Sequence, residues 1–176
     1  MSEGRQTVDY ILGRHSVREF EPGAIPPEDV ELLMEVLRWA PSAGNCQPWF
    51  FYVVENQAVK SALAAAAYHQ SFIEEAALVF VVCAEPERSA ARYGGRGRTL
   101  YCYQDTAAAV ENLLIAAHML GYGACWVGAF DEAAAREALD VPDHLRPVAI
   151  VPVGPCRPVR RFPDRRPSKS VFKIVE

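Results

Sequence analysis

The chain has 176 residues, 51% of them hydrophobic, and a formal net charge of −4. Such a composition supplies a hydrophobic core, so it excludes a mostly disordered chain. The mild acidic excess argues against a nucleic-acid-binding protein, which is normally basic. The polar first residues and the lack of an apolar run of about 20 residues predict a cytoplasmic protein without a membrane span.

The first half of the chain predicts helices alternating with two strands. After a short opening helix, a longer one is expected from Pro27, a first-turn residue, to Pro41, where proline stops it. Residues 49–54 and 77–84 are apolar throughout, which is typical of strands that are covered on both faces. Residues 56–69, between these two strands, are helical by composition.

The second half continues this alternation. Residues 99–120 form the longest predicted helix, and its many alanines allow other elements to approach closely. A strand over 124–130 is followed by a helix over 131–139 with Asp131 as its cap, and by a strand over 146–154. The sequence therefore predicts an α+β fold with about four strands and the alanine-rich helix at its centre.

The C-terminal residues 156–176 differ from the rest because they are rich in proline and arginine and have no apolar face before residues 171–175. Such a segment is typical of an arm that lies on another surface, such as a partner subunit. We expect a single domain over 1–176 that ends in this extended arm.

Near the start of the chain, Arg14, Ser16 and Arg18 stand at every second position. In an extended segment, side chains two residues apart point the same way, so these three would form one cationic, hydrogen-bonding edge. Such an edge favours an anion.

A second polar stretch, "APSAGNCQPWFF" (40–51), follows the helix that Pro41 ends. The side chains of Ser42, Asn45 and Gln47 offer hydrogen-bond donors and acceptors together, which suits a planar ring with alternating C=O and N–H groups. An ordinary helix–strand turn would also explain this composition.

Several common catalytic motifs are absent from the sequence. It has no phosphate-loop G-x-x-x-x-G-K, no H-E-x-x-H and no G-x-S-x-G, and its five cysteines include no C-x-x-C, so no metal site is indicated. No nucleophile–base pair emerges from the spacing. Any chemistry is therefore expected to come from a cofactor. A phosphate-binding edge, an amide-bearing loop and a further pair of guanidinium groups at Arg165 and Arg166 together suit flavin mononucleotide (FMN).

The chain resembles the nitroreductase family of FMN-dependent oxidoreductases over nearly its whole length. The resemblance is carried by four ordered stretches: "RHSVREF", "APSAGNCQPWFF", "RYGGRGRTLYCYQDTAAAVENLLIAAHMLGYGACWVGAF" and "LRPVAIVPVG". It implies a mostly antiparallel central sheet flanked by helices. It also implies a homodimer that exchanges C-terminal arms and holds FMN at its interface.

The resemblance also assigns FMN-binding roles by position. The ribityl-phosphate and pyrimidine contacts would be Arg14, His15, Ser16 and Arg18. The contacts from the partner chain would be Pro41, Ser42, Asn45 and Gln47. Val127, Gly128 and Ala129 would turn their backbone, with one N–H, toward the ring. Arg165 or Arg166 would bind phosphate, and the sequence does not decide between them.

The expected reaction is a ping-pong transfer of hydride from NADH or NADPH, through FMN, to a nitroaromatic, a quinone or a similar acceptor. The chemistry would occur at the flavin N5, so no catalytic side chain is assigned, and Arg14 would stabilise the reduced flavin. One alternative is a specialised FMN enzyme of the same fold: a dehalogenase, a flavin-fragmenting enzyme or a heterocycle oxidase. Another is a non-catalytic flavin-binding module.

Overall fold

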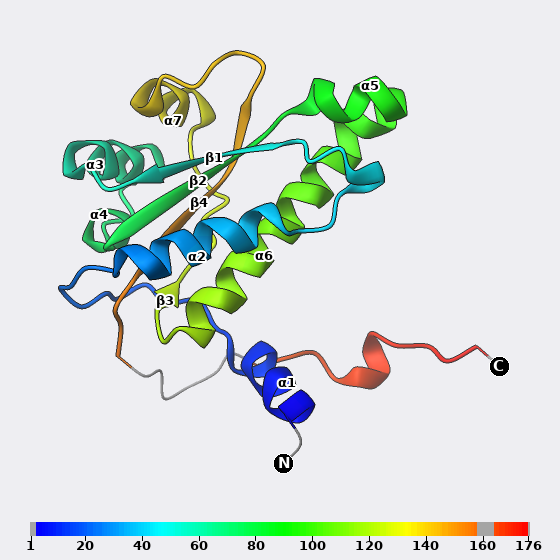
Figure 1. Ribbon diagram of the computed structural model, residues 1–176, viewed down its shortest axis with the longest axis horizontal. Helices are drawn as coiled ribbons and strands as arrows, with labels where there is room; N and C mark the ends of the chain where they lie inside the picture. The colour runs from blue at the N-terminus through cyan, green and yellow to red at the C-terminus, as the bar shows by residue number, and fades with distance from the viewer. Residues whose placement is uncertain (1–2, 158–163, 176) are drawn as a thin grey trace.

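Two layers of helices enclose a four-stranded sheet in the computed structural model of the chain (Figure 1). The structure describes residues 3–157 and 164–175, and for residues 3–7 only the backbone. The elements in chain order are α1 (Glu3–Gly13), α2 (Pro27–Arg38), β1 (Trp49–Val54), α3 (Gln57–Ala66), α4 (Phe72–Glu75), β2 (Leu78–Ala84), α5 (Pro86–Arg96), a π-helical turn (Gly97–Tyr101), α6 (Cys102–Met119), β3 (Gly123–Ala124), α7 (Glu132–Leu139) and β4 (Arg146–Gly154). Short 3-10 turns cover Ala43–Asn45 and Ser168–Ser170.

The strand order is β1-β2-β4-β3, and each neighbouring pair is antiparallel. This confirms the predicted α+β fold with a mostly antiparallel sheet. Side chains of β2 alternate between the two layers: Phe80 faces the cluster around α2 and α6, whereas Val81 faces the cluster around α3, α4 and α7. Since β2 is covered on both faces, all seven of its residues are buried.

Local sequence signals account for several element boundaries. Pro27 lies in the first turn of α2, with Glu28 and Asp29 beside it at the positive end of the helix dipole. Asp131 caps α7, since its Oδ1 accepts hydrogen bonds from the N–H groups of Ala133 and Ala134 at 2.8 and 3.1 Å. The predicted starts of these two helices are thereby confirmed, whereas α2 ends at Arg38, before Pro41.

Two predictions about strands are wrong. Strand β1, the edge strand of the sheet, is not covered on both faces, because Phe50 on one of them is 48% exposed. The predicted strand over 124–130 shrinks to the two residues of β3 and one isolated bridge between Val127 and Ile150. Its ladder is interrupted at Cys125, which stands opposite Pro152 in the register, and proline has no N–H to donate.

Helix α6 is the central helix of the fold, as predicted. It contacts α1, α2 and all four strands, and its buried residues include Ala109, Val110 and Leu113. No helix in the described part of the chain is both long and apolar enough to cross a membrane.

Candidate functional site

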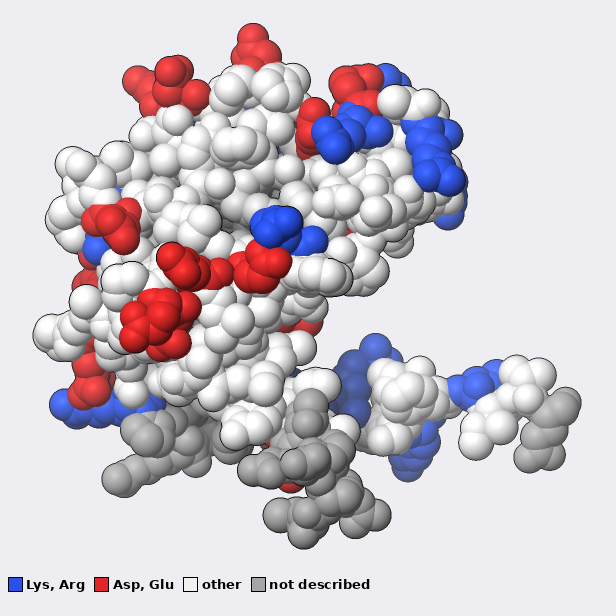
Figure 2. Space-filling view, in the orientation of Figure 1, with Lys and Arg blue, Asp and Glu red and all other residues white. Residues whose placement is uncertain are grey.

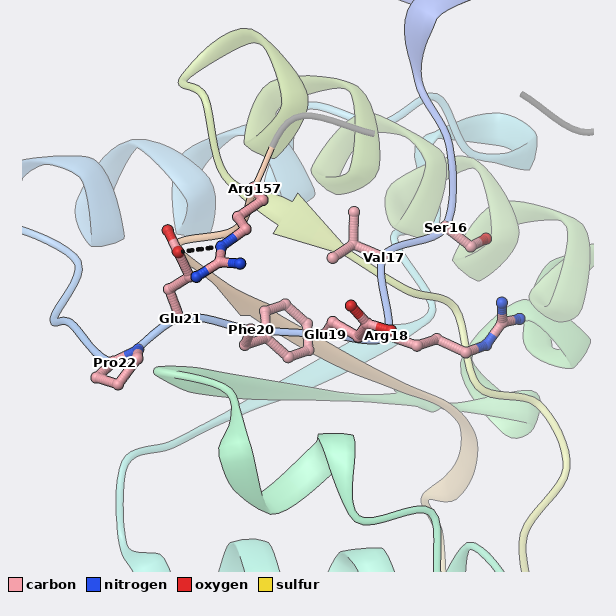
Figure 3. Close-up of a pocket in the computed structure, with 8 residues that line it drawn as sticks. All are labelled: Ser16, Val17, Arg18, Glu19, Phe20, Glu21, Pro22 and Arg157. Carbon is pink, nitrogen blue, oxygen red and sulfur yellow. Dashed lines mark hydrogen bonds and ion pairs between the residues drawn. The ribbon is translucent and has the colours of Figure 1, made fainter. Parts of the chain in front are cut away.

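The segment after α1 forms the extended edge that the sequence predicts. Ser16 makes a parallel bridge to Ala124 of β3, and the N–H of Val17 donates to the Ala124 carbonyl at 2.9 Å. Figure 3 shows the side chains of Ser16 and Arg18 leaving the segment on the same side, with Val17 on the other. Val17 is buried, so its packing holds the alternation in place.

Arg14, Ser16 and Arg18 all act on one buried atom, the thiol of Cys125. Burial raises the pKa of this thiol, while Arg18, a hydrogen bond with Ser16 and the charge of Arg14 act to lower it. Three side chains that all favour the thiolate form of Cys125 must lie near that residue. The side chains of Arg14, Ser16 and Arg18 therefore lie near Cys125 and near one another.

The Arg14 guanidinium is held beside an acidic side chain. Its Nε lies 3.4 Å from Oε1 of Glu111 on α6, and the Arg14 side chain is only 21% exposed. Arg18 is exposed, and no ion pair involves it in the described part of the chain. Arg14 is thus oriented in advance, whereas Arg18 is available to an incoming anion.

His15 lies next to a second histidine that the sequence analysis did not assign to the site. The His15 and His118 rings meet edge to face, with centroids 5.8 Å apart, and His118 also meets Tyr10 of α1 in this way. Burial, followed by the charges of His15 and Arg14, lowers the pKa of His118. His118 therefore ties the end of α1 and the edge to α6.

The amide-bearing loop has an unusual backbone. The φ angles of Gly44, Asn45 and Gln47 are all positive, at 54°, 55° and 51°. The left-handed region suits glycine and is tolerated by asparagine, but it is uncommon for glutamine. The Ser42 hydroxyl accepts a hydrogen bond from the N–H of Gln47 at 3.0 Å, so it stabilises the turn itself.

The loop presents its two amides to solvent. Nε2 of Gln47 donates to Oδ1 of Asn45 at 3.2 Å, and both residues are exposed, as is Pro41. A pair of amides joined in this way has a remaining acceptor and remaining donors that point outward. Such a pair suits the imide edge of a flat heterocycle.

The loop and the edge are attached to different parts of α6. The N–H of Ala43 donates to Oδ1 of Asp105 at 3.0 Å, whereas the edge contacts Glu111 and His118. These positions are 6 and 13 residues further along the helix, about 9 and 20 Å at 1.5 Å per residue. Among the described residues, no hydrogen bond or ion pair joins the edge to the loop.

Of the three residues expected to face the flavin ring, Val127 is buried, whereas Gly128 and Ala129 are exposed. Val127 uses both backbone groups with Ile150, its N–H donating at 2.9 Å and its carbonyl accepting at 3.0 Å. Gly128 and Ala129 are exposed, and within the described residues their N–H groups have no hydrogen bond. An N–H offered to a ligand here would therefore come from Gly128 or Ala129 and not from Val127.

Arg165 and Arg166 lie in the C-terminal arm, which runs away from the body of the chain in Figure 1. Both are exposed, and Arg166 donates to the carbonyl of Ser170 at 3.2 Å within the arm itself. The structure of one chain therefore does not bring either arginine to the edge at residues 14–18.

Three further residues near the loop were not predicted from the sequence. Arg88 and Arg92 of α5 donate to carbonyl groups of the loop at 2.6 and 2.7 Å. Asp105 is 7% exposed, and burial raises its pKa while the Ala43 N–H lowers it. These residues stand 42 to 62 positions from their partners in the sequence, so no local pattern could identify them.

The fold defines an α+β protein with an antiparallel sheet between two helical layers. The model of the nitroreductase family matches residues 11–71 and 61–155. The chain therefore belongs to the nitroreductase family and is an oxidoreductase.

Individual proteins agree with this assignment. A protein of Archaeoglobus fulgidus that carries the name NADH dehydrogenase/NAD(P)H nitroreductase is 34% identical over 85% of this chain and 84% of its own length. An FMN reductase (NADPH) of Bacillus subtilis is 25% identical over 94% of this chain and 72% of its own. The crystal structure of a nitroreductase family protein from Clostridium novyi superposes with a TM-score of 0.78 at 31% identity, covering 86% of this chain and 85% of that one.

Proposed function

We propose that the chain is an FMN-dependent oxidoreductase that takes electrons from NADH or NADPH and passes them to a nitroaromatic, a quinone or a similar acceptor. Its membership of the nitroreductase family supports this proposal, as do the relatives named for NAD(P)H and for FMN. We infer that residues 1–176 form one FMN-binding domain with a C-terminal arm over 156–176. All five cysteines lie in the described part and are free thiols, which suits the reducing cytoplasm.

The observation that carries the proposal is the pair of complementary half-sites at separate places on one chain. The edge offers two guanidinium groups and a hydroxyl, which match a phosphate, and the loop offers two amides, which match the imide edge of a flavin. The donor set thus fits FMN. Because the half-sites are attached about 9 to 20 Å apart along α6, we infer that the loop of a second copy completes each site.

The residues of the chain would bind and orient the two reactants. Arg18 and Ser16 would hold the phosphate, while Arg14, fixed by Glu111, would place its charge near the pyrimidine ring. The N–H of Gly128 or Ala129 would donate to the ring from the sheet edge. When bound, FMN supplies the two-electron chemistry by accepting and returning a hydride at N5. No side chain needs to move a proton in that transfer, which agrees with the absence of a nucleophile–base pair.

A second copy of the chain has a suitable surface to bind. A groove of about 300 Å³ between α2 and α6 is lined by Trp39, Ile115 and Met119, and the Trp39 side chain is 76% exposed. The C-terminal arm in turn exposes Phe172, Ile174 and Val175 without a covering layer. Exposed apolar surfaces of this kind mark association sites, so we infer a homodimer in which each arm packs on the partner.

The test is to purify the protein, identify any bound flavin after denaturation, and add NADH or NADPH under anaerobic conditions. We expect the protein to contain bound FMN, and the absorbance of the oxidised flavin to fall when NADH or NADPH is added. This absorbance should return when a quinone or a nitroaromatic is added. A colourless protein that takes up no added FMN would contradict the proposal. Bound FMN that neither nicotinamide reduces would contradict the enzymatic part of it.

A further inference from the structure

The loop at residues 43–48 is held from outside by α5 and by the junction before it. Nε of Arg88 donates to the Cys46 carbonyl at 2.6 Å, and a terminal nitrogen of Arg92 donates to the Gly44 carbonyl at 2.7 Å. The N–H of Glu85 donates to the Pro48 carbonyl at 2.9 Å. Three carbonyl groups of a six-residue loop thus accept hydrogen bonds from residues 85–92.

The two arginines act as a pair. Positions 88 and 92 are four residues apart, so both side chains leave α5 on the same face, which is the face toward the loop. Figure 2 shows basic side chains gathered at the upper right, over the place of α5 in Figure 1. Arg96 at the end of α5 binds the Tyr101 hydroxyl, and Arg98 in the following turn binds the Glu87 carboxylate, so these two stabilise α5 and the π-helical turn themselves.

The fit between α5 and the loop is close at Gly44. A Cβ atom on this residue would lie 2.3 Å from the Tyr93 hydroxyl oxygen and 2.7 Å from the Arg92 guanidinium carbon. A side chain here would therefore displace the ends of the Tyr93 and Arg92 side chains from the loop. The backbone of the loop also has three consecutive or nearly consecutive left-handed residues, a conformation that persists only where neighbouring groups hold it.

We propose that Arg88 and Arg92 are positioning residues that set the orientation of the Asn45 and Gln47 amides. They do so through the carbonyl groups of Gly44 and Cys46, which flank Asn45 in the chain. The inference rests on the proposed function, because it takes these amides as the groups that meet the flavin of the partner subunit. In this role each arginine acts through the loop carbonyl to which it donates, with one of its three nitrogens.

The first test measures FMN binding to the apoprotein by flavin fluorescence for the double variant Arg88→Gln, Arg92→Gln. Loss of two charge-assisted hydrogen bonds to the loop should raise the Kd for FMN by about tenfold or more. The absorption band of the bound flavin should also shift, because its imide edge meets displaced amides. The double variant with lysine, which keeps a cationic donor, should recover most of the affinity and the wild-type spectrum.

The control is Arg98→Gln, which removes a guanidinium from the π-helical turn after α5 but leaves the loop contacts intact. Its Kd for FMN should stay within about twofold of wild type. The absorption spectrum of its bound flavin should match that of wild type. A double-mutant cycle with Asn45→Ala then separates positioning from a general effect. If Arg92 acts through Asn45, Arg92→Gln should weaken binding less in the Asn45→Ala background than in the wild-type background. Fully additive effects, or a glutamine double variant that binds as the wild type does, would overturn the inference.

A second measurement needs no flavin. The N–H groups of Asn45, Cys46 and Gln47 are bonded within the loop, to the Ser42 carbonyl, the Ala43 carbonyl and the Ser42 hydroxyl. In the apoprotein their hydrogen exchange should be faster in the glutamine double variant and unchanged in Arg98→Gln. Unchanged exchange in the double variant would refute the positioning role even if FMN binds. If the wild-type protein binds no FMN but exchange is faster in the glutamine double variant, the proposed function is refuted. The contacts from Arg88 and Arg92 would then still be shown to stabilise the loop.

Discussion

Replacement of Arg14 by alanine is expected to weaken FMN binding while leaving the fold intact. The guanidinium is largely buried, 21% exposed, and oriented by Glu111, so a hydrogen bond from it to the flavin would carry a full charge at little entropic cost. Such a bond contributes about 1.5–3 kcal/mol. At 1.4 kcal/mol per tenfold change, the Kd for FMN should rise roughly 10- to 140-fold.

The cost to folding should be small in comparison. The Glu111 side chain is 47% exposed, and an ion pair with an exposed partner contributes about 0–1 kcal/mol. Urea unfolding of the Arg14→Ala apoprotein should therefore show a free energy of unfolding within that range of wild type. The folded variant should be isolated with depleted flavin.

The assay is a titration of each apoprotein with FMN at fixed ionic strength, followed by quenching of the flavin fluorescence. Glu111→Gln serves as the matched control, since it removes the same ion pair and keeps the guanidinium. This control should bind FMN more tightly than Arg14→Ala, because it keeps the guanidinium group. A folded Arg14→Ala protein with unchanged Kd and unchanged flavin content would show that Arg14 does not meet the cofactor.

Three further variants test the loop, the dimer and the histidine pair. Gly44→Ala should lower the free energy of unfolding by about 1–3 kcal/mol in urea, because φ is 54° there. Gly95→Ala, which meets nothing within 4 Å, should not lower it. Trp39→Glu should shift the protein toward monomers in analytical ultracentrifugation and release FMN, whereas Tyr68→Glu, at an exposed aromatic residue in the turn after α3, should leave it dimeric; a dimeric Trp39→Glu would disprove the assigned interface. Wild-type stability should fall as pH drops below about 6.5, since the lowered pKa of His118 means that the unfolded chain binds the proton first. His118→Gln should flatten that slope in unfolding experiments between pH 7.5 and 5.5, and an identical slope would exclude His118 as its source.

Patterns within short stretches of the sequence were sufficient for much of the fold. Proline and acidic residues define the start of α2, Asp131 caps α7, and the fully apolar run of β2 marks a central strand. The spacing of Ser16 and Arg18 likewise predicts the side on which their side chains emerge. Each of these properties depends on groups that are neighbours along the chain, so a local pattern is enough to predict them.

Helix α5 shows where local patterns fail. Its end contains Gly94 and Gly95, and Gly97 follows directly; this glycine-rich stretch gave no indication of a helix. In the structure the chain kinks at Gly94, with φ 56° and ψ −140°, and continues as a π-helical turn. Gly97 is packed so closely on Ser89 that a Cβ would lie 2.4 Å from the Ser89 carbonyl oxygen. Gly97 therefore serves close packing, which is a tertiary property.

The sequence by itself determined most of the helices and strands and their order, the cationic edge near the start of the chain and the amide-bearing loop in its first third. Only the tertiary structure decided that the edge and the loop attach to different turns of α6, and that the N–H of Val127 donates to Ile150. It alone also showed that Arg88, Arg92 and Asp105 hold the loop. The physical reason is the range of the interactions. Helix caps, proline stops and side-chain alternation act over a few residues, whereas these contacts join residues far apart in the chain that only the packing of the helices on the sheet brings together.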